Sequence, residues 1–490
     1  MASKDQLLPT LRLLDLGSSV AEFDQQLETY FIETQPFREL VGGKKDIIAG
    51  DKGTGKTAIF KILHNRYTHI PELRGIVVLP AFNLKGSPIF QSLAEMDALD
   101  EAEYIKLWNA FFLSLIGNWV LKYNKFKPKS KLALLDEILR GLELRSDADG
   151  VQPIFQKVLD RVGRLFDWKS AEAEVSVSLS GIVIKPKVDL NNDAEKRKAS
   201  VGVAASLRLL SECLKELGKT VWVAMDRLDE AFQGFPETEI PALRALLRTY
   251  LDMEEFDQIK LKLFVRRDLF ARVVAGGFVN LTHVNSRKME VIWDDEDLKT
   301  LLCRRIKGNK EFCERMEISG LGDSQIFERI FPKQVDQGER KPETWVWMMG
   351  RIQDSNGVKP PRNLIDLVTM ARDAQLRKED REPRVIGEAD DVIEPDAFRR
   401  ALTKLSETRV TDTLLAEAKH QAPLIERFRN GKAEHTRVTI AKLLGIEEAD
   451  VEAELKPLIA LGFVGESGGA YKIPMLYRAG LQITQGKAAD

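Results

Sequence analysis

Apolar and polar positions change their spacing several times along the chain, and each change predicts a different kind of element. Residues 46–49 (Asp-Ile-Ile-Ala) form a short, mostly apolar run of the length of a buried strand, and helical spacing follows over residues 58–63. Further strand-like runs lie at residues 75–80, 221–225 and 261–265. Strands separated by helical segments predict a parallel sheet in an α/β fold.

Two other stretches of the first half have patterns of their own. Residues 1–45 look helical and amphipathic, notably over residues 20–31. Several helical patterns fill residues 101–168, and residues 174–188 then show two β-like runs around Ser180-Gly181, which predicts a β-hairpin. We therefore expect a core over residues 1–290 that carries a helical and β-hairpin insertion at about residues 85–195.

The second half is almost wholly helical from Val291 onward. Its helical patterns share apolar positions at a spacing of three or four and lie at residues 296–306, 324–330, 343–352, 362–376 and 394–407. They predict an all-α lid over residues 291–410.

Residues 411–490 predict a separate, compact unit. A helix to about Phe428 and short helices at residues 438–444 and 449–460 precede β-like pieces around residues 463–464 and 471–473. Three helices followed by a hairpin are the order of a winged-helix domain.

Composition and charge narrow the classes of function. The chain has 490 residues, and its 73 Lys and Arg nearly balance its 75 Asp and Glu, so no global field favours nucleic acid or an anionic membrane. The cysteines form no C-x-x-C pair and no two histidines stand four apart, which argues against a zinc site. Residues 109–121, the most apolar stretch, are too short to span a membrane, and no signal pattern opens the chain. We expect a cytoplasmic protein.

Residues 50–57 read Gly-Asp-Lys-Gly-Thr-Gly-Lys-Thr and carry the main chemical signal. They fit the pattern G-x-x-x-x-G-K-[ST], a loop between a strand and a helix that cradles phosphates. Glycines in such a loop let backbone N–H groups point at an anion without obstruction by a Cβ atom. Lys56 can reach the β- and γ-phosphates, and the Thr57 hydroxyl can hold Mg²⁺. The expected nucleotide-binding residues are those of the loop and the first helical turn: Gly50, Asp51, Lys52, Gly53, Thr54, Gly55, Lys56, Thr57 and Ala58.

Acidic side chains follow the buried run 221–225 and are the second signal. Asp226 is placed to hold Mg²⁺, and Asp229 or Glu230 to polarise the attacking water, because a phosphate-loop ATPase handles both at a strand end. The alternative is a solvated acidic turn after a core strand. The chain has no Asn-Lys-x-Asp motif that would read guanine, which favours ATP over GTP.

Two arginines are further candidates. Arg266 ends the run 261–265 and could compensate charge at the γ-phosphate, or it could simply pair with Asp268. Arg362 follows Pro360-Pro361 at a predicted helix start and could reach the nucleotide from the lid, or it could be an exposed first-turn residue. The predicted fold class is therefore α/β: a P-loop NTPase core with a parallel sheet, an all-α lid and a winged-helix domain.

With these motifs in this order, the chain resembles a STAND-type or origin-recognition-type member of the AAA+ class. More narrowly, it resembles a group of bacterial P-loop ATPases in residues 52–58 (KGTGKTA), 264–270 (FVRRDLF) and 473–478 (IPMLYR). The resemblance implies an ATP-driven switch that forms homo-oligomers and signals, including in antiviral defence. No nuclease, TIR or protease domain is recognisable, so the output would come from a partner effector protein.

Two functions of different classes stay open. One is a regulatory ATPase whose winged helix contacts protein or locks the lid; the other is an initiator or loader whose winged helix binds duplex DNA. Residues 447–456, which would enter the major groove, carry five acids and one base, and repulsion by phosphates disfavours DNA. The basic stretch at residues 427–432 keeps contact with nucleic acid open. A nucleotide-binding scaffold with negligible turnover is a third possibility.

Overall fold

The computed structural model describes the chain in ten segments: residues 7–81, 99–147, 150–160, 175–178, 181–184, 202–228, 236–275, 277–385, 387 and 390–489. Its contacts divide the chain into two compact units. The sheet unit comprises Thr34–Gly50 and Lys56–Val291, and the helical unit comprises Met1–Glu33, Asp51–Gly55 and Ile292–Asp490. The predicted domain boundaries at residues 290 and 410 stay predictions.

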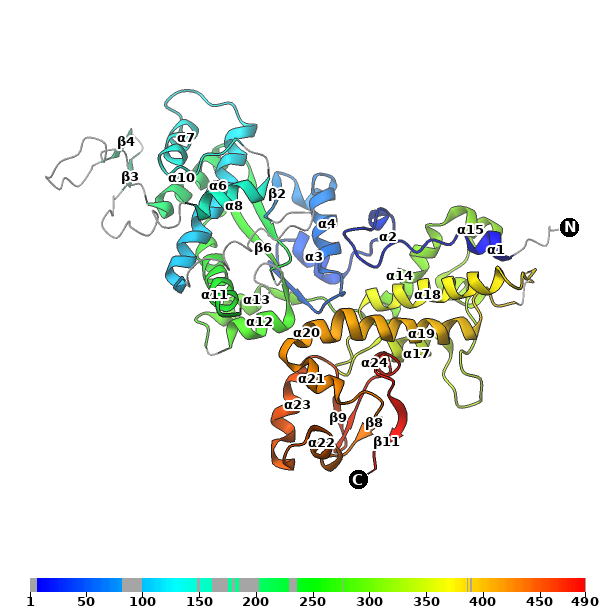
Figure 1. The fold of residues 1–490 in the computed structure, drawn as a ribbon. Helices are drawn as coiled ribbons and strands as arrows, with labels where there is room; N and C mark the ends of the chain where they lie inside the picture. Colours follow the sequence, from blue (N-terminus) through cyan, green and yellow to red (C-terminus); the bar gives the residue numbers. More distant parts are fainter. Residues whose placement is uncertain are drawn as a thin grey trace. The chain divides into compact units, whose positions relative to one another are not determined.

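The sheet unit is built on a five-stranded sheet in which all neighbouring strands are parallel (Figure 1). The strand order is β2-β5-β6-β1-β7. The strands, in chain order, are β1 (Ile47–Gly50), β2 (Ile76–Pro80), β5 (Thr220–Met225), β6 (Ile259–Arg266) and β7 (Lys288–Glu290). The first four coincide with the predicted strand-like runs, and the parallel sheet confirms the α/β class.

The short strand β1 lies inside the sheet and is buried along its whole length. It pairs with β6 on one side, where Gly50 aligns with Arg266, and with β7 on the other, where Ala49 aligns with Glu290. Parallel strands that are buried on both faces read as continuous apolar runs, which is why Ile47, Ile48 and Ala49 were recognisable in the sequence.

Helices of the sheet unit pack against this sheet and against one another. They are α3 (Gln35–Val41), α4 (Lys56–Arg66), α6 (Glu101–Tyr123), α7 (Lys131–Gly141), α8 (Val151–Leu159), α10 (Val203–Glu216), α11 (Pro236–Met253), α12 (Arg267–Val274) and α13 (Leu281–Ser286). The long helix α6 begins with a capping box formed by Asp100 and Glu103, and its buried residues include Trp108. Strands β3 (Val175–Ser178) and β4 (Gly181–Ile184) pair antiparallel, as the predicted hairpin requires.

A buried polar cluster surrounds Asp46, immediately before β1. The Asp46 carboxylate, fully buried, forms an ion pair with Lys262 and accepts hydrogen bonds from Arg287 Nε (2.7 Å) and the Tyr250 hydroxyl (3.1 Å). The Lys262 ammonium lies 3.8 Å from the centre of the Trp222 ring, and burial lowers its pKa. A buried charge needs such partners, so this cluster ties the starts of β1 and β7 to β6.

The helical unit contains the helices predicted for the lid. They are α14 (Asp295–Lys307), α15 (Lys310–Arg315), α16 (Asp323–Ile330), α17 (Thr344–Ile352), α18 (Pro361–Glu379) and α19 (Pro395–Arg409), and a π-helical turn at Val410–Leu415 follows α19 directly. The N-terminal helices α1 (Leu7–Leu11) and α2 (Leu27–Tyr30) belong to the same unit.

The prediction of a continuous helix over residues 20–31 is wrong, since only Leu27–Tyr30 is helical there. Asp24 explains the difference. Its carboxylate is buried, accepts hydrogen bonds from the Gln26 backbone N–H (3.2 Å) and the Tyr30 hydroxyl, and forms an ion pair with Arg305 (3.0 Å). An Asp side chain that bonds the backbone two residues on favours a turn over a helix.

The end of the chain has the predicted winged-helix order, within the helical unit. Its elements are α20 (Ala416–Ala418), α21 (Ala422–Glu426), β8 (Lys432–His435), α22 (Arg437–Leu444), α23 (Val451–Ala460), β9 (Gly465–Ser467), β10 (Ala470–Lys472), α24 (Met475–Arg478) and β11 (Thr484–Lys487). The four strands form one sheet in the order β11-β8-β10-β9. Strands β8 and β11 were not predicted from the sequence. None of the helices in the described segments is long and apolar enough to cross a membrane.

Replacing Asp46 should destabilise the sheet unit strongly. In Asp46→Ala the Lys262 ammonium stays buried without its carboxylate, and breaking a buried ion pair in this way costs about 3–5 kcal/mol. Urea unfolding followed by tryptophan fluorescence measures the change. Glu255→Ala, which removes the partner of exposed Arg208, is the matched control and should cost less than about 1 kcal/mol.

A double variant separates charge burial from lost packing. If the cost arises from the unpaired ammonium, Asp46→Ala combined with Lys262→Met should be more stable than Asp46→Ala alone. Equal stability of these two variants would contradict the role assigned to the ion pair.

Candidate functional site

The phosphate loop occupies the turn between β1 and α4, as the motif requires. Strand β1 ends at Gly50 and helix α4 begins at Lys56. Gly53 and Gly55 have φ angles of +80° and +99°, which side chains with a Cβ atom rarely adopt. The glycine pattern of the loop is therefore a backbone requirement, and the N-terminus of α4 follows it directly, where free N–H groups favour an anion.

Polar groups of the loop are held by its own backbone. The Lys56 ammonium donates to the Gly50 carbonyl (2.9 Å), and the Thr54 hydroxyl donates to the Asp51 carbonyl (2.8 Å). Thr57 and Ala58 lie in the first turn of α4 and are half-buried. One partner of Lys56 is thus a neutral oxygen, and an ammonium binds a charged phosphate oxygen more strongly than it binds a neutral carbonyl.

The parallel sheet brings the other predicted strand-end residues of the sheet unit to the same edge as the loop. Asp226 follows the last residue of β5 and is 3% exposed. Arg227 has a left-handed backbone (φ 56°), so the chain turns sharply directly after Asp226. Arg266 ends β6 in register with Gly50. Asp229 and Glu230 lie outside the described residues.

Arg266 pairs with Asp268, which was one of the two possibilities that the sequence left open. Its guanidinium forms two hydrogen bonds to the Asp268 carboxylate, Nε to Oδ1 (2.9 Å) and Nη2 to Oδ2 (3.2 Å). Burial opposes ionisation of Asp268, but the charge and hydrogen bonds of Arg266 hold the pKa of this carboxyl below its usual value. The bidentate pair fixes the guanidinium at the sheet edge, and its role toward a nucleotide stays a prediction.

Residues Asp51–Gly55 pack within the helical unit, and Arg362 meets them there. Arg362 is the second residue of α18. A Cβ atom added to Gly53 would lie 3.1 Å from the Cβ atom and 3.5 Å from the Cδ atom of Arg362. The arginine stem therefore runs directly over Gly53, so Arg362 is not simply an exposed first-turn residue.

Two further contacts to the loop were not predicted. The Trp293 indole N–H donates to the Thr54 carbonyl (2.8 Å), and the Lys52 ammonium lies 3.2 Å from the Glu417 carboxylate. Glu417 belongs to α20, shortly after the π-helical turn. No local pattern announces either contact, because each joins residues that are hundreds of positions apart in the sequence.

The oxygen ligands that the structure describes near the loop are too few to hold Mg²⁺ by themselves, and they suit a Mg²⁺ ion that is also bound by phosphates. Among the described residues, no group of three or more His, Cys, Asp or Glu side chains could hold a metal ion. Mg²⁺ usually keeps one or two protein ligands and completes its shell with phosphate oxygens and water. The buried carboxylate of Asp226 and the Thr57 hydroxyl are ligands of the type that such a site needs.

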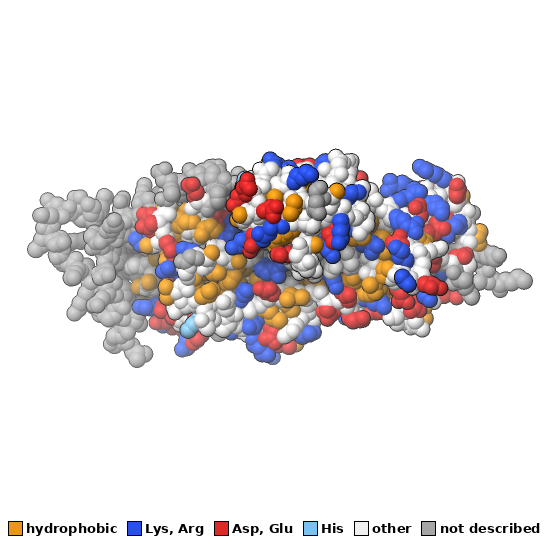
Figure 2. Space-filling model, turned by 90° about the horizontal axis from the view of Figure 1, so that it is seen from below, with side chains coloured by type: hydrophobic (Ala, Val, Ile, Leu, Met, Phe, Trp, Pro, Cys, Tyr) orange, Lys and Arg blue, Asp and Glu red, His pale blue; other side chains and the backbone are white. Residues whose placement is uncertain are grey.

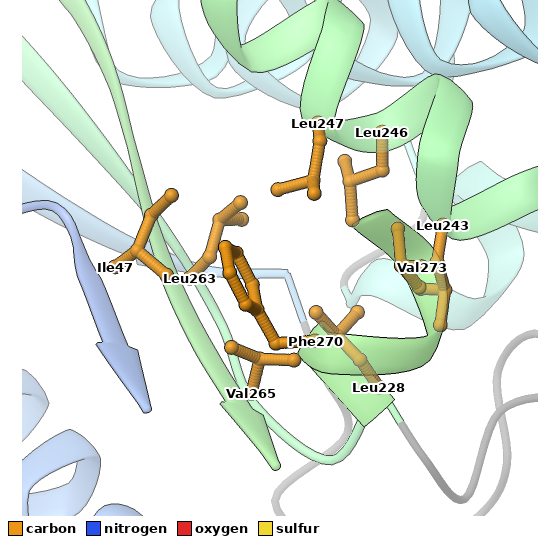
Figure 3. Close-up of a pocket in the computed structure, with 9 residues that line it drawn as sticks. All are labelled: Ile47, Leu228, Leu243, Leu246, Leu247, Leu263, Val265, Phe270 and Val273. Atoms are coloured by element: carbon orange, nitrogen blue, oxygen red, sulfur yellow. The ribbon is translucent and has the colours of Figure 1, made fainter. Parts of the chain in front are cut away.

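An apolar pocket of the sheet unit lies beside these strand ends and has a different character. Figure 3 shows its lining side chains, which come from β1, β6, α11 and α12 and from the turn after β5. All nine are apolar: Ile47, Leu228, Leu243, Leu246, Leu247, Leu263, Val265, Phe270 and Val273. A lining without polar groups cannot bind phosphate, so we place the candidate nucleotide site at the loop.

Comparison with known proteins gives similarity only at the level of structure. No protein-family model matches the chain, and no curated protein matches its sequence significantly. The structure is similar to the Walker-type ATPase paby2304 of Pyrococcus abyssi (14% identity, TM-score 0.42, 96% of this chain and 100% of that chain). It is also similar to the Aeropyrum pernix ORC2 protein in ADPNP-ADP complexes (14% identity, TM-score 0.40, 94% of this chain and 98% of that chain). A third similar structure is the Aeropyrum pernix ORC1 protein in complex with DNA (11% identity, TM-score 0.35, 95% of this chain and 96% of that chain).

Gly53→Ala tests the packing of the loop against Arg362. The new methyl group meets the Arg362 stem at 3.1 Å in addition to the strain of a positive φ angle. Gly468→Ala, with φ +60° and no atom within 4 Å of the new Cβ, is the matched control and should show the strain alone, about 1–2 kcal/mol. Thermal unfolding should reveal a larger loss for Gly53→Ala; equal losses would show that the arginine stem yields without cost.

Proposed function

We propose that this chain binds ATP with Mg²⁺ and hydrolyses it, and that it works as a regulatory switch. The observation that carries the proposal is the sheet edge at which the phosphate loop, Asp226 and Arg266 end neighbouring strands, with Gly50 in register with Arg266. Glycine-rich backbone, a lysine and a buried carboxylate at one edge are the parts that phosphoryl transfer uses for positioning and charge compensation.

The proposed roles follow from chemistry. Gly50, Asp51, Lys52, Gly53, Thr54, Gly55, Lys56, Thr57 and Ala58 form the nucleotide-binding loop, and Arg362 contributes from the lid. Thr57 and Asp226 hold Mg²⁺, and Arg266 compensates charge in the transition state. Asp229 or Glu230 orients the attacking water. Turnover is expected to be slow or to depend on a partner.

The switch would act in the cytoplasm as a homo-oligomer together with a partner effector protein. The resemblance to STAND-type ATPases supports this part of the proposal, and bacterial antiviral defence is the setting that it suggests. The domain division that goes with it is a core over residues 1–290, a lid over residues 291–410 and a winged-helix domain over residues 411–490.

A DNA-binding initiator or loader is the second candidate, and surface charge opposes it. Helix α23 and the turn before it expose their acidic side chains, which are Glu447, Glu448, Asp450, Glu452 and Glu454. In the hairpin of β9 and β10, Glu466 is exposed, and the single basic residue, Lys472, lies 3.8 Å from the Glu434 carboxylate. On the face shown in Figure 2, acidic and basic side chains are intermingled. The exposed acids of α23 and of the turn before it repel the closely spaced phosphates of a duplex.

The basic stretch at residues 427–432 is largely committed to internal contacts. Arg427 donates a hydrogen bond to the Leu444 carbonyl, and Arg429 forms two hydrogen bonds to the Glu426 carboxylate (2.6 and 2.8 Å). Side chains held in this way are poorly placed to neutralise phosphates, which weakens the case for DNA further.

Lys56→Ala should reduce ATP affinity by at least about thirtyfold, because the charge of the β- and γ-phosphates loses its compensating ammonium. Isothermal titration with ATP and Mg²⁺ measures the change. Lys44→Ala removes an exposed lysine of the same unit, paired only loosely with Glu39 (3.5 Å), and should leave the affinity unchanged. Unaltered ATP binding by Lys56→Ala would refute the assignment of the phosphate loop.

The full chain should not bind duplex DNA at physiological salt, for the reason of charge given above. Fluorescence anisotropy with a labelled duplex at micromolar protein measures this. A variant with Glu448→Lys, Glu452→Lys and Glu454→Lys should gain salt-sensitive binding if the fold itself could enter the groove. Tight, salt-sensitive binding by the unaltered chain would favour the initiator function instead.

A further inference from the structure

Arg409 is a buried charged residue that the sequence did not single out. It is the last residue of α19, it is 7% exposed, and the π-helical turn Val410–Leu415 follows it. Its Nη2 atom forms an ion pair with Asp366, while its Nε atom has no hydrogen-bond partner among the described residues. Buried guanidinium groups are normally fully hydrogen-bonded, so part of the donor capacity of Arg409 is unused.

Asp366 links Arg409 to the phosphate loop through α18. It lies four positions after Arg362 on this helix, which places both on one side of α18. The stem of Arg362 runs over Gly53, at 3.1 Å from a Cβ atom built there. Helices α18 and α19 pack along each other, so Arg362, Asp366 and Arg409 form one charged group, and Arg362 is its member that contacts the loop.

Like charges meet in this group. Burial, and then the positive charge of Arg362, lower the pKa of Arg409 to about 10. Two guanidinium groups thus share a buried region in which Arg409 is paired with Asp366 and is also stabilised by the charge of the Asp412 carboxylate. An anion between them would relieve their repulsion, and phosphate is the anion that the adjoining loop is built to receive.

We propose that Arg409 is a second arginine, alongside Arg362, that binds the terminal phosphate of a nucleoside triphosphate held on the loop. Asp366 holds Arg409 in place before the nucleotide arrives and competes with the phosphate for it. A guanidinium fork can bind two phosphate oxygens at once, and this geometry suits a γ-phosphate reached from the lid. This role of Arg409 rests on the proposed ATP binding, and it makes the affinity for ATP higher than the affinity for ADP.

A purely structural ion pair between α18 and α19 makes a different prediction. In that case Arg409→Met and Asp366→Asn would weaken the fold, and any nucleotide binding, to the same extent and without regard to the γ-phosphate. If Arg409 binds phosphate, the two variants act in opposite directions. Arg409→Met removes a ligand of the phosphate, whereas Asp366→Asn removes a competing carboxylate and a nearby negative charge.

The experiment measures ATP and ADP affinity of the full chain by isothermal titration. Arg409→Met should lose roughly tenfold to a hundredfold in ATP affinity and little in ADP affinity, as expected for lost hydrogen bonds to a charged group. Asp366→Asn should keep or gain ATP affinity. Arg400→Met, an exposed arginine of α19 paired with Asp396, is the control and should resemble the unaltered chain.

The conservative variant Arg409→Lys covers the case in which Arg409→Met fails to fold. Lysine keeps the positive charge and its pairing with Asp366 but loses the bidentate fork. The ratio of ATP affinity to ADP affinity should therefore be smaller in this variant than in the unaltered chain. Unchanged ATP affinity in Arg409→Met or Arg409→Lys, or equal losses in Arg409→Met and Asp366→Asn, would overturn the inference. ATP binding that Lys56→Ala does not affect would instead refute the proposed function, together with this inference.

Discussion

The pairing of β1 on both sides is the constraint on which the candidate site depends. This strand has four residues, yet its peptide groups bond to β6 on one side and β7 on the other, in the interior of a sheet where unpaired groups are costly. Asp46 anchors its start, with Lys262 and Arg287 as ionic partners. The first residue of the phosphate loop, Gly50, is therefore fixed in position relative to Arg266.

Charged side chains around the loop already have partners that a phosphate could replace. Lys56 donates to a carbonyl, Lys52 pairs with Glu417, and Arg409 pairs with Asp366. These contacts hold the cations in place, so little of their side-chain entropy remains to be lost in any further contact.

The winged-helix domain shows why a fold does not determine a function. Its order of helices and strands is one that DNA-binding proteins share, but exposed glutamates cover the helix that would enter the groove. Its first helix, α20, carries Glu417, which meets Lys52 of the loop. The order of elements by itself therefore does not assign a partner to this domain.

The sequence by itself determined the elements and the phosphate loop. Buried strands had to be apolar, helices had to repeat every three or four residues, and the positive φ angles of Gly53 and Gly55 required glycine, so each feature left a local trace. The acidic character of α23 was equally plain. Local patterns failed at residues 20–26, where the buried Asp24 makes a turn with the Gln26 backbone and forms an ion pair with Arg305, a partner that no window of sequence contains.

Only the tertiary structure decided which distant residues meet. It placed β6 between β1 and β5, so that Arg266 lies beside Gly50, and it brought Trp293, Glu417 and Arg362 to the loop. It also paired Arg409 with Asp366, two residues that are unremarkable in the sequence. The physical reason is that hydrophobic periodicity specifies which face of an element is buried but not which other element buries it.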